Sequence, residues 1–551
     1  MQARLVEDLI KMADSVSSRF LVLVLNALVL GLISTIPCAN GANFLATLFH
    51  PAGQASHYRF IARITSGLMA RGHTVTLLVT DTYELKGFDK DNVATRIIKF
   101  KTTTSSPIKS IFNDMLSTPD QAEPGILLTM KMFLALRDYS LQSCEDLFND
   151  RELMIDLRKQ NFDLVLLQMF VPCDPLVAEY LKVPYIAMTP SSRFPAFDED
   201  VYNMEMPSSY VPFESMSDLT DEMSFVQRVQ NFVGRYGMLK FIQYLNTRPY
   251  RKLQLEHNID PTSSIREISG RAELWLCHID FALEFPHPTA PNWIMIAGLV
   301  AEGETKPLTQ ELESFVQGSG EHGVIVFSLG STDVNLLSGR MNEDFAKAFS
   351  ELPQRVLWKY VGPPLRNLGN NTRLMSWLPQ RDLLAHPKTK LLIYHGGLAG
   401  VYEAMHFKKP MVLIPLFADQ PSVAARIAKK KMGAVLKKST LSADLIRSTI
   451  NQVLTDPSYQ ANVEKYGSIS KDTIVSPLET AMFWIEHIVK FGGSHLKSRA
   501  GEMNFVALNS LDVIAFLLVI VLLGLYIDYL ILRSCYRCIT RGKTTAKPKS
   551  D

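Results

Sequence analysis

The sequence has almost no net charge and few cysteines. Its 551 residues include 57 basic and 55 acidic side chains, a formal net charge of +2, so there is no global field to attract nucleic acid. We expect no nucleic-acid partner. Of the six cysteines, one lies near the N-terminus and two near the C-terminus, which leaves Cys144, Cys173 and Cys277 between them. Three spread thiols exclude a disulfide framework and allow at most one bridge.

Long apolar runs are also scarce, and the two that stand apart lie at the ends of the chain. The first, FLVLVLNALVLGLISTI, spans Phe20–Ile36, follows Arg19 and precedes small or turn-forming residues. This arrangement is typical of a signal peptide. We therefore expect residues 1–41 to be a leader and signal peptide, with Met12 as an alternative start. A buried core helix is the alternative interpretation of the run.

The second apolar run, Leu511–Leu532, has 22 residues, close to the ~20 that cross a bilayer core. It predicts one transmembrane helix. The basic residues in 533–551 predict a short cytosolic tail and place the preceding domains on the luminal side. Lys547 and Lys549 resemble a dilysine retrieval signal of the endoplasmic reticulum, with an ordinary basic flank as the alternative. We expect a single-pass protein of the endoplasmic reticulum membrane, whose only glycosylation sequon begins at Asn370.

Between these ends the chain alternates predicted strands and helices. Its 47% hydrophobic residues can bury sizeable cores, and its length predicts two or three globular units. A strand over Asn43–Phe49, a helix from about His57 to Arg71 and a strand over Thr74–Thr80 follow one another within forty residues. Such a unit predicts a parallel sheet. A further unit has its strand at Leu164–Met169 and its helix at Pro175–Leu181.

A proline-containing linker, FPHPTAPNW, divides the chain into two α/β halves. We expect an N-terminal domain over residues 42–290 and a C-terminal domain over 291–490. Ligands collect at the carboxyl ends of strands in such sheets, so two facing sheets would form a cleft. The segment Met223–Ile242 has an amphipathic pattern. It indicates either affinity for lipophilic molecules or a helix that packs between domains.

The second half contains a strand-to-helix junction, KLLIYHGGLAGVYEAM, from Lys390 to Met405. A helix that begins near His395 points unpaired N–H groups and a positive dipole end at the sheet edge, and Gly396 and Gly397 allow an anion to approach the backbone. A phosphate is the natural ligand. Glu403 lies ~12 Å further along the helix, within reach of sugar hydroxyls. A purely structural turn is the alternative.

Two neighbouring motifs favour a nucleotide-sugar site. Trp377 and Gln380 precede the junction in SWLPQRDLLAHP, where an aromatic face can stack on a base and an amide can bond its edge. Asp419 and Gln420 follow in PLFADQP, where they can hold the hydroxyls of a hexose.

These motifs resemble the UDP-glycosyltransferase family, of the membrane-bound animal type that is similar to UDP-glucuronosyltransferases. The run SWLPQRDLLAHPKTKLLIYHGGLAGVYEAMHFKKPMVLIPLFADQ carries its signature, and FVQGSGEHGVIVFSLGS and RGHTVTLL match elsewhere, so the resemblance spans Ala42 to Lys549. It implies the GT-B fold, two Rossmann-like domains facing a cleft, plus the C-terminal transmembrane helix. The acceptor would bind mainly to the N-terminal domain and the UDP-sugar mainly to the C-terminal one.

The resemblance also implies a role for individual residues. Trp377 would stack on uracil, Gln380 would contact the nucleoside, and Glu403 would hold the ribose. His57 would be the general base, which suits a side chain with a pKa near neutrality. Direct displacement would invert the anomeric carbon without a cofactor or metal. The whole UDP-sugar site would comprise Ser331, Lys359, Trp377, Gln380, His395, Gly396, Gly397, Glu403, Asp419 and Gln420.

Some positions depart from the family pattern. Gln168 stands where the family places the acid that orients and charges the base; an amide can fix the histidine tautomer but cannot compensate the imidazolium. Asp174 is a possible substitute. Departures in the donor half are Tyr394, Ala399, Lys408 and Val423, and Lys359 stands where arginine is frequent.

Two hypotheses follow. The first is an active, inverting glycosyltransferase that moves a hexose or hexuronic acid from a UDP-sugar to a hydroxyl of a small lipophilic acceptor. The second is a non-catalytic homologue that binds such ligands, or that regulates a catalytic relative by forming a homo- or hetero-oligomer.

Overall fold

A computed structural model describes most of the chain between the two terminal segments. Residues 1–40, which hold nearly all of the expected signal peptide, and residues 544–551, which hold both lysines of the retrieval signal, lie outside the described residues, as does Ser331. The described residues are 41–48, 54–83, 93–105, 107, 110–111, 126–168, 172–190, 201, 204, 206–213, 217–330 and 336–543.

The first domain is built on a seven-stranded sheet in which every pair of neighbouring strands is parallel. Buried apolar runs form its central strands, as expected for a sheet covered on both faces. In sheet order the strands are β3 (Arg96–Phe100), β2 (Thr74–Thr80), β1 (Asn43–Leu48), β4 (Leu164–Gln168), β5 (Tyr185–Thr189), β6 (Leu274–Cys277) and β7 (Trp293–Met295). The parallel sheet predicted from the two strand–helix units is confirmed.

Helices connect these strands, and the connection from the edge strand β3 to β4 passes β2 and β1 in the sheet order. The helices of this part are α2 (Gln54–Ala70), α4 (Ile126–Asn149), α5 (Arg151–Lys159), α6 (Cys173–Leu181), α8 (Phe225–Glu256) and α9 (Ile265–Gly270). A disulfide joins Cys144 on α4 to Cys173 at the start of α6, and Cys277 is a buried free thiol. The single bridge that the cysteine count allows is therefore present.

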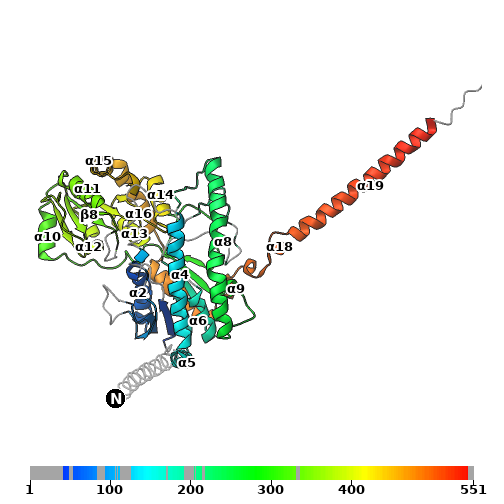
Figure 1. Cartoon of the computed structure of the whole chain (residues 1–551), viewed down its shortest axis with the longest axis horizontal. Helices are drawn as coiled ribbons and strands as arrows, with labels where there is room; N and C mark the ends of the chain where they lie inside the picture. The colour runs from blue at the N-terminus through cyan, green and yellow to red at the C-terminus, as the bar shows by residue number, and fades with distance from the viewer. Residues whose placement is uncertain are drawn as a thin grey trace, which may run out of the picture.

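The second domain has a six-stranded parallel sheet. Its strands, in sheet order, are β10 (Thr372–Met375), β9 (Arg355–Lys359), β8 (Val324–Ser328), β11 (Thr389–Tyr394), β12 (Met411–Leu413) and β13 (Gly433–Val435). Its helical segments are α10 (Gln310–Gln317), α11 (Gly339–Ser350), α12 (Gln380–Ala385), α13 (Leu398–His406), α14 (Gln420–Lys429), η2 (Lys438–Thr440), α15 (Ala443–Thr455) and α16 (Pro457–Lys471). Two Rossmann-like α/β domains, as expected, make up the globular body (Figure 1).

The packing does not follow the expected boundary at residue 290. β7 pairs with β6, so the first sheet extends to Met295. α17 (Pro477–Phe491) returns to the first domain and buries Met482 and Ile485 in the core formed by β1 and α2. Arg71 at the end of α2 bonds Glu486 on α17. A helix that follows the second domain in the sequence thus completes the first domain, because its apolar side packs against α2.

Buried polar contacts join the two domains. Arg426 on α14 forms an ion pair of 2.7 Å with Glu284, and both side chains are almost fully buried. Tyr402 on α13 donates a hydrogen bond from its hydroxyl to Asp280, and accepts one from the Asp280 amide at 2.8 Å. Breaking a buried ion pair is costly, so these contacts hold the domains in one relative position.

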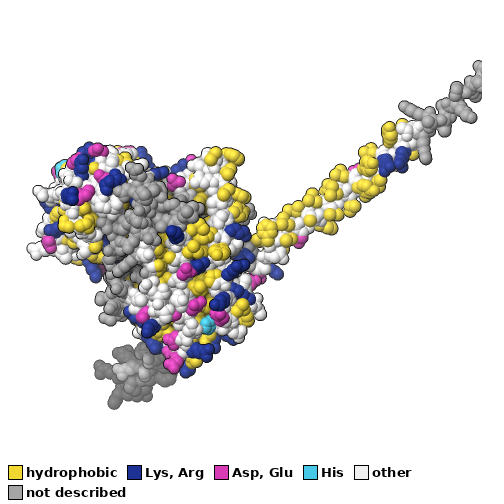
Figure 2. Space-filling view, in the orientation of Figure 1, with side chains coloured by type: hydrophobic (Ala, Val, Ile, Leu, Met, Phe, Trp, Pro, Cys, Tyr) yellow, Lys and Arg dark blue, Asp and Glu magenta, His cyan; other side chains and the backbone are white. Residues whose placement is uncertain are grey.

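The chain leaves the body through short segments and ends in a long helix. These segments are η3 (Ser494–Leu496), η4 (Arg499–Glu502), α18 (Phe505–Leu508) and α19 (Leu511–Lys543). α19 projects away from the body with exposed apolar side chains (Figure 1, Figure 2). It begins at the predicted residue, Leu511, and continues past the predicted end at Leu532. Among the described residues it is the one helix long and apolar enough to cross a membrane.

Candidate active site

His57 and Gln168 meet at the carboxyl end of the first sheet. β1 leads into α2, which carries His57 in its first turns, and Gln168 is the last residue of β4, the strand that pairs with β1. The buried side-chain amide of Gln168 hydrogen-bonds Nδ1 of His57. The parallel pairing of β1 with β4 therefore brings the predicted base together with the residue at the position of the family's acid.

The hydrogen bond sets the tautomer of His57. With Gln168 Nε2 donating to Nδ1, the Gln168 Oε1 atom is buried and has no hydrogen-bond partner among the described residues. Flipping the amide places Oε1 on a protonated Nδ1, which satisfies Oε1 and leaves Nε2 of His57 free of a proton. That second arrangement is the one a general base needs.

Burial also keeps His57 neutral. Desolvation lowers the pKa of the His57 imidazole to about 4. A carboxylate at position 168 would oppose this effect by favouring the imidazolium, whereas the glutamine carries no charge. His57 is thus unprotonated at neutral pH and able to accept a proton, but as a weak base.

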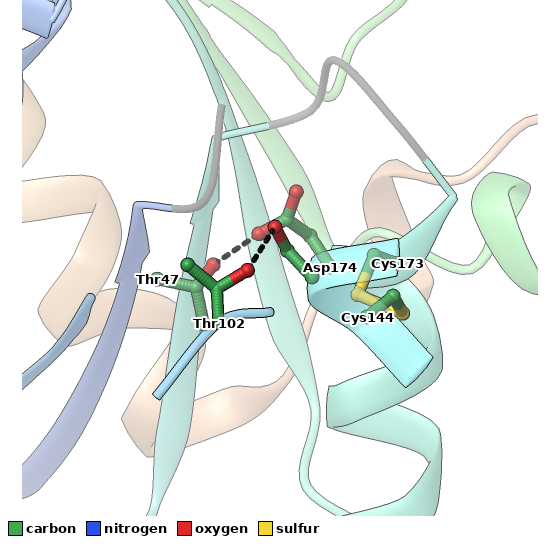
Figure 3. The surroundings of a disulfide bond; sticks show 6 residues. Thr47, Thr102, Cys144, Cys173 and Asp174 are labelled. Atoms are coloured by element: carbon green, nitrogen blue, oxygen red, sulfur yellow. Dashed lines mark hydrogen bonds between the residues drawn. A yellow bond between two sulfur atoms is a disulfide. The ribbon is translucent and has the colours of Figure 1, made fainter. Parts of the chain in front are cut away.

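Asp174, the possible substitute for the missing acid, has a different partner. Its carboxylate accepts a 2.5 Å hydrogen bond from the Thr47 hydroxyl at the end of β1. Figure 3 shows this pair beside the Cys144–Cys173 disulfide. Burial raises the pKa of Asp174 to about 7, against the lowering effect of the Thr47 bond. Asp174 therefore bonds Thr47 and its own backbone rather than His57.

The predicted phosphate cradle follows β11 in the second sheet. Gly396 has a φ of +92°, which only glycine adopts at low cost, and Gly397 is the N-cap of α13. The His395 ring lies against two glycines, Gly330 and Gly397. A Cβ on Gly330 would lie 2.8 Å from the Cε1 atom of the ring, and a Cβ on Gly397 would lie 2.5 Å from its Nε2 atom. The nine-residue helix α13 thus points its first amides at the sheet edge beside His395.

His395 is itself suited to an anion. Its Nδ1 atom is buried, with no hydrogen-bond partner in the part of the chain that the structure describes. Desolvation, with a smaller effect from Lys359, lowers its pKa to about 3. A neutral imidazole can donate one hydrogen bond to a phosphate oxygen without bringing a second buried charge to the site.

Glu403 is almost fully enclosed by its surroundings. It lies on α13 with 2% of its side chain exposed, and its Oε2 atom accepts a 2.7 Å hydrogen bond from Gln380 Nε2. Its Oε1 atom is 3.5 Å from the guanidinium of Arg59. Burial raises the pKa of Glu403, whereas Arg59 and the Gln380 bond lower it. Gln380 and Glu403, predicted to share the nucleoside, are in direct contact.

Trp377 presents an accessible ring next to this carboxylate, with 41% of the residue exposed. The Arg59 guanidinium lies 5.9 Å from the ring centroid, and the Lys359 ammonium lies 5.5 Å from it. Lys359 also donates a 2.7 Å hydrogen bond to the Gly330 carbonyl. An exposed aromatic ring flanked by two cations suits a base that is followed by phosphates.

Asp419 and Gln420 lie at the start of α14, after β12. The Gln420 carbonyl oxygen lies 3.3 Å from where a Cβ on Gly396 would be, so these residues border the phosphate cradle. Gln420 is buried, and its Oε1 atom accepts hydrogen bonds from the amides of Leu416 and Phe417. Part of its side chain therefore shapes the loop that leads to the site.

The residues that depart from the family pattern differ in their structural environment. Val423 is fully buried in the core, and Tyr394 is buried with its ring centroid 4.2 Å from that of His395. Lys408 has a φ of +56°. This non-glycine residue adopts the left-handed conformation at the end of α13, where glycine would be favoured.

The structure brings together most of the residues predicted for the site, and it adds Arg59, which was not among them. The structure places His57 next to Gln168 in the first domain. In the second domain it brings together Trp377, Gln380, His395, Glu403 and Lys359. Arg59 belongs to the first domain yet contacts Glu403 and lies near Trp377 in the second. Its position two residues after His57 was the available signal.

Comparison with known proteins agrees with this geometry. Residues 46–546 match the family described as UDP-glucoronosyl and UDP-glucosyl transferase. UDP-glucuronosyltransferase 2B33 of Macaca mulatta is 35% identical over 518 residues, covering 91% of this chain and 94% of that protein. UDP-glucuronosyltransferase 2B7 of Homo sapiens is 34% identical over 504 residues, with coverage of 90% and 94%.

Solved structures share the fold at low sequence identity. The glycosyltransferase of kitacinnamycin has a TM-score of 0.55 at 15% identity, and covers 82% of this chain and 99% of its own. The spinosyn forosaminyltransferase SpnP has a TM-score of 0.55 at 16% identity, with the same coverage. These likenesses support the GT-B architecture of the two parallel sheets. The chain belongs to the UDP-glycosyltransferase family and is a GT-B glycosyltransferase that uses a UDP-sugar.

Proposed function

We propose that the protein moves a hexose or hexuronic acid from a UDP-sugar to a hydroxyl of a small lipophilic acceptor, with inversion at the anomeric carbon. The observation that carries this proposal is the Arg59–Glu403 contact, which holds the helix of His57 against the predicted ribose site. An acceptor hydroxyl near His57 would then face the sugar of a donor bound along Trp377, Glu403 and His395.

His57 acts as the general base in this proposal. Its Nε2 atom takes the proton of the acceptor hydroxyl while the oxygen attacks the anomeric carbon. The new C–O bond forms as the bond from that carbon to UDP breaks, and UDP leaves with the electron pair. Attack opposite the leaving group inverts the carbon. Gln168 holds the base by accepting from Nδ1–H through Oε1.

The second domain stabilises the leaving group. The first amides of α13 and the dipole of this helix meet the diphosphate, and His395 donates to a phosphate oxygen. Lys359 lies close enough to affect the pKa of His395 and adds a positive charge. Glu403 and Gln380 bind the ribose, Trp377 stacks on uracil, and Asp419 and Gln420 bind the transferred sugar. Ser331, outside the described residues, remains a predicted donor contact.

The names of the relatives suggest which donor to test first. The similar mammalian proteins are called UDP-glucuronosyltransferases, so UDP-glucuronic acid leads a panel with UDP-glucose, UDP-galactose and UDP-N-acetylglucosamine. Membranes that contain the protein are incubated with each donor and a set of lipophilic alcohols and phenols, and UDP release is measured. Measurable donor binding without UDP release for any acceptor favours the non-catalytic homologue that regulates a partner by oligomerising.

We also propose that the protein is anchored in the endoplasmic reticulum membrane by α19, with both domains luminal and the basic tail cytosolic. The described chain supports a test, because Asn370 of the sequon is exposed. Glycan removal from the expressed protein should increase its gel mobility, and Asn370→Gln should abolish the shift. A wild-type protein without a shift, when a luminal control protein is shifted, contradicts use of this site.

A further inference from the structure

α8 has an apolar side that faces away from the protein. Exposed large apolar residues recur along it at helical spacing, and at 100° per residue they fall within an arc of about 120°. The exposed fraction of the residue is 72% for Phe225, 73% for Val226 and 64% for Val233. We call this set the outer arc of α8: Phe225, Val226, Val229, Phe232, Val233, Tyr236 and Tyr244.

The inward side of the same helix is polar. Asn231 and Arg235 are almost fully buried. Asn231 accepts a 2.7 Å hydrogen bond from the Phe213 amide and donates at 2.8 Å to the carbonyls of Ser208 and Val211. A surface helix normally turns its apolar side to the core. α8 does the reverse over its first three turns, so folding alone does not explain its apolar residues.

Figure 2 shows the consequence on the surface, where apolar side chains gather at the upper end of α8. In Figure 1 this end rises beyond the neighbouring elements. A contiguous apolar surface of this kind marks a contact with another apolar phase or molecule. The next question is which contact the surroundings favour.

The charges of α8 favour an anionic lipid surface. Its one acidic residue is Glu256, whereas its basic residues, apart from the buried Arg235, are Arg228, Lys240, Arg248, Arg251 and Lys252. Lys240 lies within the outer arc and Arg228 at its edge, and both are exposed. Long basic side chains extend from an apolar surface to lipid headgroups, and the two tyrosines suit the same interface.

A second copy of the chain fits less well. In a two-fold dimer the same surface meets itself, so Lys240 and Arg228 of both copies would be brought into one interface. Like charges at close range are destabilising. A membrane with anionic headgroups removes that conflict.

The membrane anchor is connected beside α8. The segment that leads to α19 is fastened by Lys497, whose ammonium bonds the Arg271 carbonyl at 2.9 Å and the Glu273 carboxylate at 2.7 Å. Arg271 caps α9, which packs against α8. α8 and the outgoing α18 and α19 lie on the same side of the body in Figure 1.

We propose that the outer arc of α8 lies in the headgroup and upper acyl region of the bilayer that α19 spans, on the side of the globular domains. The helix would lie along the surface as an amphipathic element. The first domain would then be held at the bilayer by a second contact, close to where lipophilic compounds concentrate. The inference does not depend on sugar transfer.

The test uses the full-length chain with its exposed thiols removed by Cys535→Ser and Cys538→Ser. Val229→Cys and Gln230→Cys are made separately and labelled with a nitroxide. These adjacent positions are both exposed but lie about 100° apart around the helix, with Val229 on the outer arc. The protein is reconstituted in vesicles of phosphatidylcholine and phosphatidylserine, and collision of each label with oxygen and with a water-soluble nickel chelate is measured.

The proposal predicts a severalfold lower nickel collision rate, and a higher oxygen collision rate, at Val229 than at Gln230. Equal collision rates at the two positions would overturn it. Protection of Val229 that grows with the protein-to-lipid ratio, together with spin–spin broadening, would also overturn it, in favour of a second copy. Both side chains point outward, so neither substitution disturbs the core.

Discussion

Arg59 and Glu403 join the two domains across the candidate active site, with the guanidinium nitrogen 3.5 Å from the carboxylate oxygen. Arg59 lies on the helix of His57, and Glu403 lies on the helix whose first turn faces the predicted diphosphate. The carboxylate is buried, so its ionisation depends on that cation and on Gln380. The predicted base and the predicted ribose ligand are therefore coupled through one ion pair.

Replacing Arg59 with glutamine should weaken donor binding. Without the guanidinium, burial dominates and the pKa of Glu403 rises, so a larger fraction is protonated and cannot accept from ribose hydroxyls. We expect the KM for the UDP-sugar to rise roughly tenfold, about 1.4 kcal/mol, and most steeply at the acidic end of the pH range. Arg63→Gln on the same helix serves as the control. A lower KM would show instead that Arg59 competes with the ribose.

Replacing His57 with alanine should abolish turnover and leave UDP binding unchanged. A positioned general base typically contributes about 10²–10⁴-fold to the rate, and His57 belongs to the domain opposite the phosphate cradle. Single-turnover kinetics and UDP binding by calorimetry measure the two quantities. A variant that turns over at the wild-type rate would refute the assignment of the base.

Replacing Gln168 with aspartate should raise kcat and shift its pH dependence. The pKa of His57 is about 4, so the wild-type base is unprotonated above that value and activity falls as the pH drops through about 4. A carboxylate beside Nδ1 raises this pKa, and the acid limb moves upward with it. Gln168→Asn has the size of aspartate without its charge. If Gln168→Asp and Gln168→Asn lose activity at the same acidic pH, the negative charge at position 168 does not limit catalysis.

Replacing Lys408 with glycine should stabilise the second domain. Lys408 has a φ of +56°, and a left-handed conformation costs a residue with a Cβ about 1 kcal/mol more than glycine. Thermal unfolding should report a gain of about 1 kcal/mol. Lys408→Ala keeps the Cβ and should show no such gain. An equal effect of the two variants would mean that the lysine side chain, rather than backbone strain, is responsible.

Removing the disulfide should destabilise the first domain. Cys144 and Cys173 are 29 residues apart, and the loss of a crosslink around a loop of that length costs about 3–4 kcal/mol by chain entropy. Cys144→Ser and the double variant with Cys173→Ser should lose the same amount, since each lacks the one bridge. Cys535→Ser, at an exposed position on α19, is the control. Unfolding at the wild-type midpoint would show that the bridge contributes nothing.

Local sequence pattern predicted much of the fold. Buried apolar runs specified β1, β2 and β4, and the glycine-containing junction after β11 specified the start of α13. The same applies to the start of α19 at Leu511. These features depend on backbone hydrogen bonds and side-chain periodicity within short stretches, which the residues themselves encode.

Other features depended on which surfaces pack together. The residues 42–290 expected for the first domain omit β7 and α17, because a strand pairing and a helix docking over long sequence separations are not visible in local pattern. For the same reason the sequence does not show that Asp174 bonds Thr47, at the end of β1, rather than His57.

The sequence by itself determined the two α/β halves and the apolar helix, because each follows from short-range periodicity and composition. Only the tertiary structure decided that Arg59 meets Glu403, 344 residues away, and that α8 turns Asn231 inward and Phe232 outward. An amphipathic pattern reveals that a helix has an apolar side, but the direction of that side is set by the packing of the whole domain.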